Sequence, residues 1–172
     1  MFRFWLLSGS PDNCLLALKE SKWGSSRKLE FIWKKMAPGD VLAIYASKPV
    51  SRVIGFAKVK DKLVEDNVFW PDEREAGMIL YPLRLTFTAE KLLEPEAWQS
   101  EGVFIGDLKV PTYRSLNPVV DRSIIASLLE RASTQWKTNL DHLMPPKVVE
   151  EVKKRRKREV DMPPTLHTKI RD

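Results

Sequence analysis

Hydrophobic and polar residues alternate along this chain in short blocks that predict a mixture of strands and helices. Apolar blocks rich in β-branched and aromatic residues predict four strands, at residues 2–7, 41–46, 52–60 and 78–88. Gly55 predicts a bulge or a close backbone approach in the third strand, and Pro82 predicts an edge position or a bulge in the fourth.

Three segments predict helices. The first covers residues 11–20, because Ser10 is a good N-cap and Pro11 suits the first helical position. Apolar residues recur with helical spacing from Leu29 to Met36 and again over 123–135, and each set predicts one buried helix face. The strands are too few and too unevenly spaced for a sandwich, and no repeat is visible. The pattern predicts an α+β fold, with a small curved or closed sheet and flanking helices.

The domain organisation follows from where the charge lies. The net charge is +6, and residues 147–172 carry 9 basic and 5 acidic residues, a net +4. We therefore predict one domain over residues 1–143 and a basic linker or tail, part helical, over 144–172. Such a basic run is typical of a nucleic-acid arm or of a solvated helix end.

Composition excludes several classes of site. One Cys and two His do not supply a disulfide framework or a tetrahedral zinc site, and we expect no metal or cofactor. An unpaired thiol, with no apolar run long enough to span a membrane, favours a cytoplasmic location. Phosphate-binding glycine motifs are missing, and the two histidines come too late in the chain for a plausible Ser/His/Asp set. Asp72 and Glu73, in an acidic and irregular stretch over residues 61–77, leave a metal-dependent nuclease as an alternative.

The chain has six Trp, and two of them stand apart from the predicted elements. Trp23 precedes a glycine, and Trp70 lies between Phe69 and Pro71, so both are expected in loops. Aromatic residues in loops are candidates for stacking on a ligand, although core packing is the commoner role of Trp.

The order of several short motifs resembles that of EVE domains and the related YTH domains, which belong to the PUA-like superfamily. The resemblance covers about residues 2–88 and depends on the order of the motifs, with Asn13 ten residues before Trp23 as in YTH domains. The motifs are Phe4-Trp5-Leu6-Leu7-Ser8, Asn13, Lys22-Trp23-Gly24-Ser25, Pro38-Gly39-Asp40 and Val53-Ile54-Gly55-Phe56-Ala57-Lys58-Val59.

This resemblance implies a small curved β-barrel with flanking helices that binds a modified base flipped into an aromatic cage. It implies a nucleic-acid partner, N6-methyladenine in DNA more than RNA, and no catalysis. EVE-like domains also precede the AAA+ motor of McrB-type restriction proteins, and the end of this chain resembles such a linker. The RNA-binding YTH-type reader is the nearest alternative, and a protein-interaction module with Trp23 and Trp70 as an exposed patch is another.

The resemblance also assigns residues to roles. Trp23 matches the first cage wall and Asn13 the polar contact to the base edge, while Gly24 replaces a serine, so that only its backbone carbonyl could serve. Trp70 matches the second wall, with Phe69 as the alternative. Ser8, Tyr45 and Ser47 are further candidates for the pocket. Basic residues near these positions are candidates for phosphate contacts or for a solvated face: Arg27, Lys28, Lys34, Lys35, Lys48 and Arg52.

Overall fold

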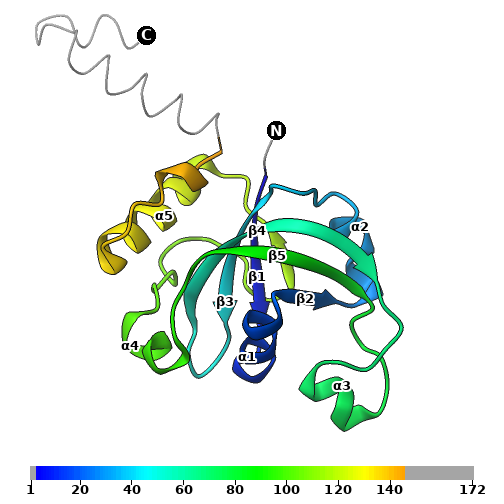
Figure 1. The fold of residues 1–172 in the computed structure, drawn as a ribbon. Coiled ribbons are helices and arrows are strands. Elements are labelled where there is room, and N and C mark those ends of the chain that lie inside the picture. Colours follow the sequence, from blue (N-terminus) through cyan, green and yellow to red (C-terminus); the bar gives the residue numbers. More distant parts are fainter. Residues whose placement is uncertain (1–2, 146–172) are drawn as a thin grey trace, which may run out of the picture.

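A strongly curled, mixed sheet of six strands forms the centre of the molecule (Figure 1). The computed structural model describes residues 3–145. The strands run in the order β2-β5-β4-β3-β1-β6, and all neighbours are antiparallel except β1 and β3, which are parallel. Their bounds are β1 Phe4–Gly9, β2 Lys22–Ser25, β3 Val41–Ala46, β4 Arg52–Val64, β5 Leu83–Leu92 and β6 Leu116–Pro118.

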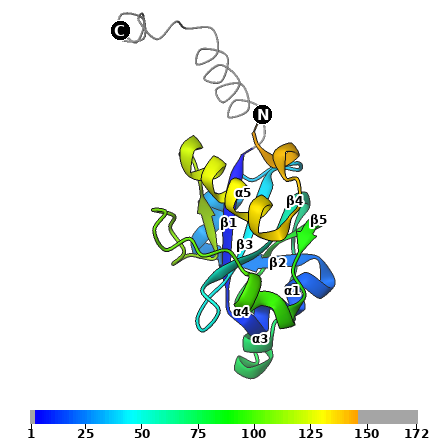
Figure 2. The same ribbon diagram turned by 90° about the vertical axis from the view of Figure 1, so that its left-hand side faces the viewer.

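Helices cover both faces of this sheet, and Figure 2 shows α5 lying across the strands. The predicted first helix is α1, and its Ser10 hydroxyl accepts a hydrogen bond from Asn13 N at 3.2 Å, as the N-cap prediction requires. The helices are α1 Pro11–Glu20, α2 Glu30–Trp33, α3 Pro71–Ala76, α4 Trp98–Glu101 and α5 Arg122–Trp136, with short 3₁₀ turns at Arg27–Leu29, Pro95–Ala97 and Asp141–Leu143.

The period of two along each strand divides the core into two clusters. In β1, Trp5 and Leu7 pack with α1, whereas Phe4 and Leu6 pack with α5. Because the sheet is buried on both faces, its central strands consist of continuous apolar runs rather than of alternating polar and apolar residues. The α+β fold class predicted from the sequence is confirmed.

The turn at Pro38-Gly39-Asp40 fixes the start of β3 against β1. The Asp40 carboxylate is buried and accepts hydrogen bonds from Trp5 Nε1 at 2.9 Å, from Ala37 N at 3.0 Å and from Arg3 N at 3.1 Å. A buried acid with several donors is satisfied, so this aspartate has a structural role that joins the turn to the first strand.

Three element predictions need correction. The second helix is shorter than its apolar spacing suggests, because a 3₁₀ turn precedes the single turn of α2. The stretch over residues 61–77 is irregular only in part: β4 extends to Val64, residues 65–70 have no regular structure, and α3 follows. β5 begins only after Pro82 and runs to Leu92, because the N–H groups of Leu80 and Tyr81 donate to Glu73 instead of to a strand. The tail predicted over 144–172 lies almost entirely outside the described residues.

Candidate functional site

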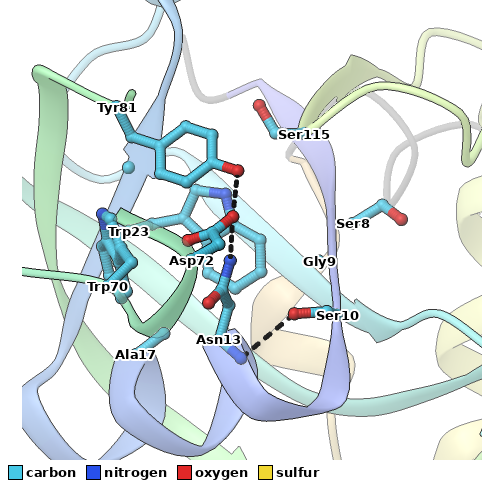
Figure 3. Close-up of a pocket in the computed structure, with 11 residues that line it drawn as sticks. Ser8, Gly9, Ser10, Asn13, Ala17, Trp23, Trp70, Asp72, Tyr81 and Ser115 are labelled. Carbon is cyan, nitrogen blue, oxygen red and sulfur yellow. Dashed lines mark hydrogen bonds between the residues drawn. The ribbon is translucent and has the colours of Figure 1, made fainter. Parts of the chain in front are cut away.

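A pocket of about 160 Å³ lies where α1, β2 and the start of α3 meet the end of β1 (Figure 3). It reaches the surface, because Ser10 is exposed and Asn13, Tyr81 and Ser115 are half-buried. The residues that line it are Ser8, Gly9, Ser10, Asn13, Ala17, Trp23, Gly24, Trp70, Asp72, Tyr81 and Ser115.

Two tryptophans form the apolar walls. Trp23 lies in β2 opposite Leu85 of β5 and is 4% exposed, and Trp70 is the N-cap residue of α3 and is 2% exposed. Both therefore belong to the core as well as to the pocket. In Figure 3 Trp70 is seen edge-on and Trp23 from its face, so the two indoles are adjoining walls rather than parallel plates.

Glycines provide the space for these indoles. A Cβ at Gly24 would lie 2.4 Å from Trp70 Nε1, and a Cβ at Gly9 would lie 3.0 Å from the Trp23 ring. Neither glycine has a positive φ, so close approach rather than backbone freedom explains their presence. Gly24 thus lies under the second tryptophan.

Both indole N–H groups are buried, and within residues 3–145 neither has a hydrogen-bond partner. A buried donor without a partner costs about 1–3 kcal/mol. Trp5, Trp33 and Trp98 each donate to an oxygen of the protein. The pocket tryptophans therefore differ from these core tryptophans, because their indole N–H groups have no partner among residues 3–145.

A chain of three polar side chains forms one edge of the pocket. The Asp72 carboxylate accepts hydrogen bonds from Asn13 Nδ2 at 3.3 Å and from the Tyr81 hydroxyl. Burial, followed by the hydrogen bond to Asp72, raises the pKa of Tyr81 well above its usual value, so its hydroxyl remains protonated and donates. Because Asp72 engages the Asn13 nitrogen, the Asn13 oxygen is turned toward the Trp70 side (Figure 3). This edge therefore presents acceptor atoms.

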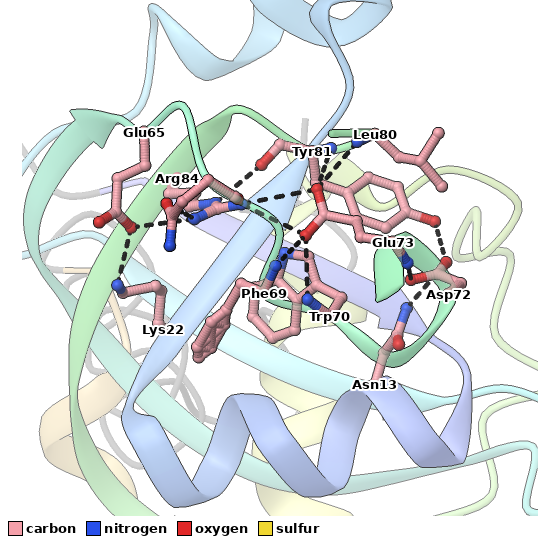
Figure 4. Close-up of polar contacts among 11 residues, drawn as sticks. Asn13, Lys22, Glu65, Phe69, Trp70, Asp72, Glu73, Leu80, Tyr81 and Arg84 are labelled. Atoms are coloured by element: carbon pink, nitrogen blue, oxygen red, sulfur yellow. Dashed lines mark hydrogen bonds and ion pairs between the residues drawn. The ribbon is translucent and has the colours of Figure 1, made fainter. Parts of the chain in front are cut away.

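One buried carboxylate holds the segment that carries Trp70 and Tyr81 (Figure 4). Glu73 Oε1 accepts from Phe69 N and Trp70 N, both at 2.9 Å, and Oε2 accepts from Leu80 N at 2.8 Å and Tyr81 N at 2.9 Å. Burial alone raises the pKa of Glu73, but the four backbone donors outweigh it and the net pKa lies below its usual value. Glu73 thus closes residues 69–81 into a fixed loop.

Arg84 of β5 compensates the charge of this carboxylate. Its side chain is fully buried and lies 3.3 Å from Glu73 Oε1 and 3.3 Å from Glu65 Oε1. It also donates to the Tyr81 carbonyl at 2.9 Å and to the Asn67 carbonyl at 2.6 Å. The arginine therefore ties the pocket loop to the sheet at both of its ends.

The structure brings together most of the candidates for the base-binding pocket. Trp23, Asn13, Trp70 and Gly24 all line it, although Trp23 lies in a strand and not in the loop predicted from the sequence. Ser8 also lines it, but its side chain points away from the polar edge (Figure 3).

Three other candidates do not line the pocket. Tyr45 packs on the α5 side of the sheet, because it shares a face with Val41 and Ala43. Ser47 N donates to the Gly9 carbonyl at 2.8 Å, so its turn is adjacent to the pocket. Phe69 packs edge-on against Trp70, with ring centroids 4.7 Å apart.

The basic candidates divide into three groups. Arg27 and Lys34 both pair with Glu30, at 3.3 and 3.2 Å, and, like their neighbours Lys28 and Lys35, are exposed. Lys48 is exposed in the turn that contacts Gly9 through Ser47. The sixth does not line the pocket: Arg52, the first residue of β4, packs against Gly102, where a Cβ on Gly102 would lie 2.6 Å from Arg52 Cβ.

Sequence reasoning missed Tyr81 and Ser115 and considered Asp72 only as a metal ligand. Pro71 followed by two acids is a helix N-terminal signal that could have placed α3 and directed Asp72 toward the pocket. No sequence signal links Ser115 to β2, because their contact is a hydrogen bond of 2.8 Å between Ser25 Oγ and Ser115 Oγ, which are 90 positions apart.

Two alternatives lose the features on which they depended. The Glu73 carboxylate is engaged by its backbone donors and by Arg84. Among residues 3–145, no group of three or more His, Cys, Asp or Glu side chains is placed to hold a metal ion. Trp23 and Trp70 are buried, so they do not form an exposed patch for a protein partner.

Solved structures share this architecture, although no family model and no curated protein matches the sequence. The YTH domain of Toxoplasma CPSF4, solved with a 7-mer m6A-modified RNA, aligns over 84% of this chain and 97% of its own, at 14% identity and a TM-score of 0.52. A point mutant of the ASCH protein from Zymomonas mobilis aligns over 74% of this chain and 97% of its own, at 12% identity and a TM-score of 0.53.

The fold is similar to that of these YTH and ASCH domains. Rpa0253 from Rhodopseudomonas palustris has a similar structure, aligning over 77% of this chain and 94% of its own at 14% identity and a TM-score of 0.51. The resemblance inferred from the sequence motifs is thus confirmed at the level of the fold. Within residues 3–145, no helix is long and apolar enough to cross a membrane.

Proposed function

We propose that this PUA-like domain recognises a nucleic acid by holding one flipped, modified base in the pocket between Trp23 and Trp70. The observation that carries the proposal is a pocket of about 160 Å³ that has two indole walls, Trp23 and Trp70, beside an edge of acceptor atoms.

The size and chemistry of the pocket suit a single base. A cavity of about 150 Å³ accommodates one benzene ring, so the volume of about 160 Å³, open to solvent, fits one flat heterocycle and not two. Stacking on an aromatic ring is worth about 1–3 kcal/mol per base, which offsets the few kcal/mol needed to flip it out of a stack.

The polar edge favours a base that carries an amino group. With its nitrogen engaged by Asp72, Asn13 offers an oxygen, and this atom accepts a hydrogen bond from an exocyclic N–H. N6-Methyladenine keeps one such N–H and adds a methyl group whose burial contributes about 0.8 kcal/mol. We propose N6-methyladenine, in DNA before RNA, as the ligand, with methylated cytosine as the nearest competitor.

The test is a panel of fluorescent oligonucleotides of one sequence that carry adenine, N6-methyladenine, cytosine or 5-methylcytosine, each as DNA and as RNA. Tightest binding to the N6-methyladenine strand supports the proposal, and equal binding to all members contradicts it. Trp23→Phe and Trp70→Phe keep an apolar ring in the pocket, and Trp33→Phe is the matched control outside it. The two pocket variants should lose affinity for the modified strand while the control keeps it.

The biological setting is a separate part of the proposal. The basic segment over residues 147–172 fits a linker to a motor domain of a modification-dependent restriction system. A chain ended after Leu143 should keep its preference for the modified base and bind all oligonucleotides more weakly, by a factor that shrinks as salt rises. Loss of the preference itself would contradict this division of roles.

A further inference from the structure

Two exposed aromatic rings and an arginine form a cluster beside the pocket, defined here as Phe31, Tyr113 and Arg114. Phe31 is 56% exposed and Tyr113 is 78% exposed. The Arg114 guanidinium carbon lies 6.0 Å from the centroid of the Phe31 ring and 5.1 Å from that of Tyr113. These distances place the cation against both rings.

The backbone of this cluster is fixed to the pocket. Ser115, the next residue along the chain, lines the pocket and bonds to Ser25 at the end of β2. The Asn117 side chain donates to the Arg114 carbonyl at 2.7 Å and to the Leu6 carbonyl at 3.1 Å, which joins the segment to β1. Consecutive Cα atoms are about 3.8 Å apart, so the cluster begins one residue beyond the rim.

The charge of Arg114 is uncompensated in the part of the chain that the structure describes. Arg27, Arg84 and Arg131 each pair with a carboxylate, whereas the Arg114 side chain has only its two ring contacts there. An arginine held on exposed rings keeps its N–H donors available for a phosphate, and the rings keep a face available for a base.

We propose that the cluster of Phe31, Tyr113 and Arg114 is a stacking platform for the nucleotide next to the flipped base. This inference rests on the proposed function of the pocket. A nucleic acid is the occupant that the cluster favours, because the positive charge complements a phosphate and the aromatic faces complement a base. Stacking tolerates any base, so the platform adds affinity for the flanking nucleotide without selecting its identity.

The experiment uses the full chain and four single-stranded oligonucleotides that carry one N6-methyladenine. One is intact, and the others have an abasic residue on the 5′ side, the 3′ side or both sides of the modified base. For the wild type, the abasic residue on one side should weaken binding by about fivefold or more. In Tyr113→Ala the intact strand should bind as weakly as that abasic strand does to the wild type, and the abasic residue should have no further effect.

The matched control is Phe104→Ala, because Phe104 is also 56% exposed but lies beside α5, where its carbonyl accepts from Arg131. This variant should respond to abasic residues as the wild type does. If the Tyr113→Ala and Phe31→Ala variants bind all four strands like the wild type, the proposal of a stacking platform is wrong.

Failure of the platform is distinct from failure of the pocket. The preference for N6-methyladenine over adenine, measured with both flanking residues abasic, depends on the pocket alone. If the wild type shows this preference but ignores the flanking bases, the pocket stands and the platform is refuted. If it shows no preference, the proposed function fails.

Discussion

Glu73→Gln tests how the pocket is held open. The substitution keeps the shape of the side chain but replaces one carboxylate oxygen with an NH₂ group. Each oxygen of Glu73 accepts from two backbone N–H groups, and both lie near Arg84. In either orientation of the glutamine amide, its NH₂ group therefore faces two backbone N–H groups, which are also donors. The buried arginine also loses part of its counter-charge.

The expected cost is large because all the groups involved are buried. Both Glu73 and Arg84 have side chains with no exposed surface, and breaking a buried ion pair by altering one partner costs about 3–5 kcal/mol. We expect Glu73→Gln to destabilise the domain by about 3 kcal/mol, near the lower limit of that range, since the glutamine oxygen still accepts two bonds. The loop over residues 69–81 should open first, displacing Trp70 and Tyr81.

Urea unfolding measures this stability, and hydrogen exchange of the Trp70 and Tyr81 amides measures the loop. Glu75→Gln is the matched control, because Glu75 is on the same helix but exposed. The variant should unfold at lower urea with faster exchange at both amides, while the control matches the wild type. A change in the free energy of unfolding below about 1 kcal/mol, the size of an ordinary substitution, would refute the reasoning.

Further predictions concern the pocket and the titrating groups. Gly24→Ala should abolish base binding and cost about 1–3 kcal/mol of stability in a thermal melt, because the new Cβ meets Trp70 Nε1 at 2.4 Å; unchanged binding would show that Trp70 is not a wall. Asn13→Asp should weaken binding in a titration more than Asn13→Ala does, because it places a second carboxylate beside Asp72; the reverse order would contradict the proposed polar edge. Burial raises the pKa of the Cys14 thiol to about 12, so a thiol reagent at pH 8 should label it only after denaturation; rapid labelling of the folded chain would contradict this burial. The pKa of Glu73 is lowered in the fold, so its contribution to stability is complete above the unfolded pKa of about 4.3 and is lost as the pH falls through the folded pKa. The melting temperature of the wild type should therefore fall in acid, and that of Glu73→Gln should fall less.

The strands β1, β3, β4 and β5 and the helices α1 and α5 could be predicted because their signals are local, whereas the short strands β2 and β6 were missed. Ser10 and Pro11 mark the start of α1, and the apolar run from Val41 to Ala46 is β3 at its observed bounds. The loop that carries Trp70 could not be placed in this way. Its conformation depends on Glu73 reaching Leu80 and Tyr81, up to eight residues away, and on Arg84 in β5.

Some residues of the candidate site could be predicted from the order of the motifs along the chain. Asn13, Trp23 and Trp70 were selected by their order along the chain and lie around one pocket. Tyr45 and Ser47 were selected because they lie near the end of a predicted strand, but the alternation of β3 turns Tyr45 to the face opposite the pocket. Ser115 could not be found, because its place depends on a tertiary contact with β2.

The central claim is that the pocket between Trp23 and Trp70 distinguishes a modified base from its unmodified parent. The most direct measurement is a titration of the wild-type chain with two oligonucleotides that differ only in one methyl group, on the N6 atom of a single adenine. Burial of that methyl group alone contributes about 0.8 kcal/mol, or roughly fourfold in affinity. The account predicts at least this preference for the methylated strand, and its loss in Gly24→Ala. Equal affinity for the two strands would contradict it.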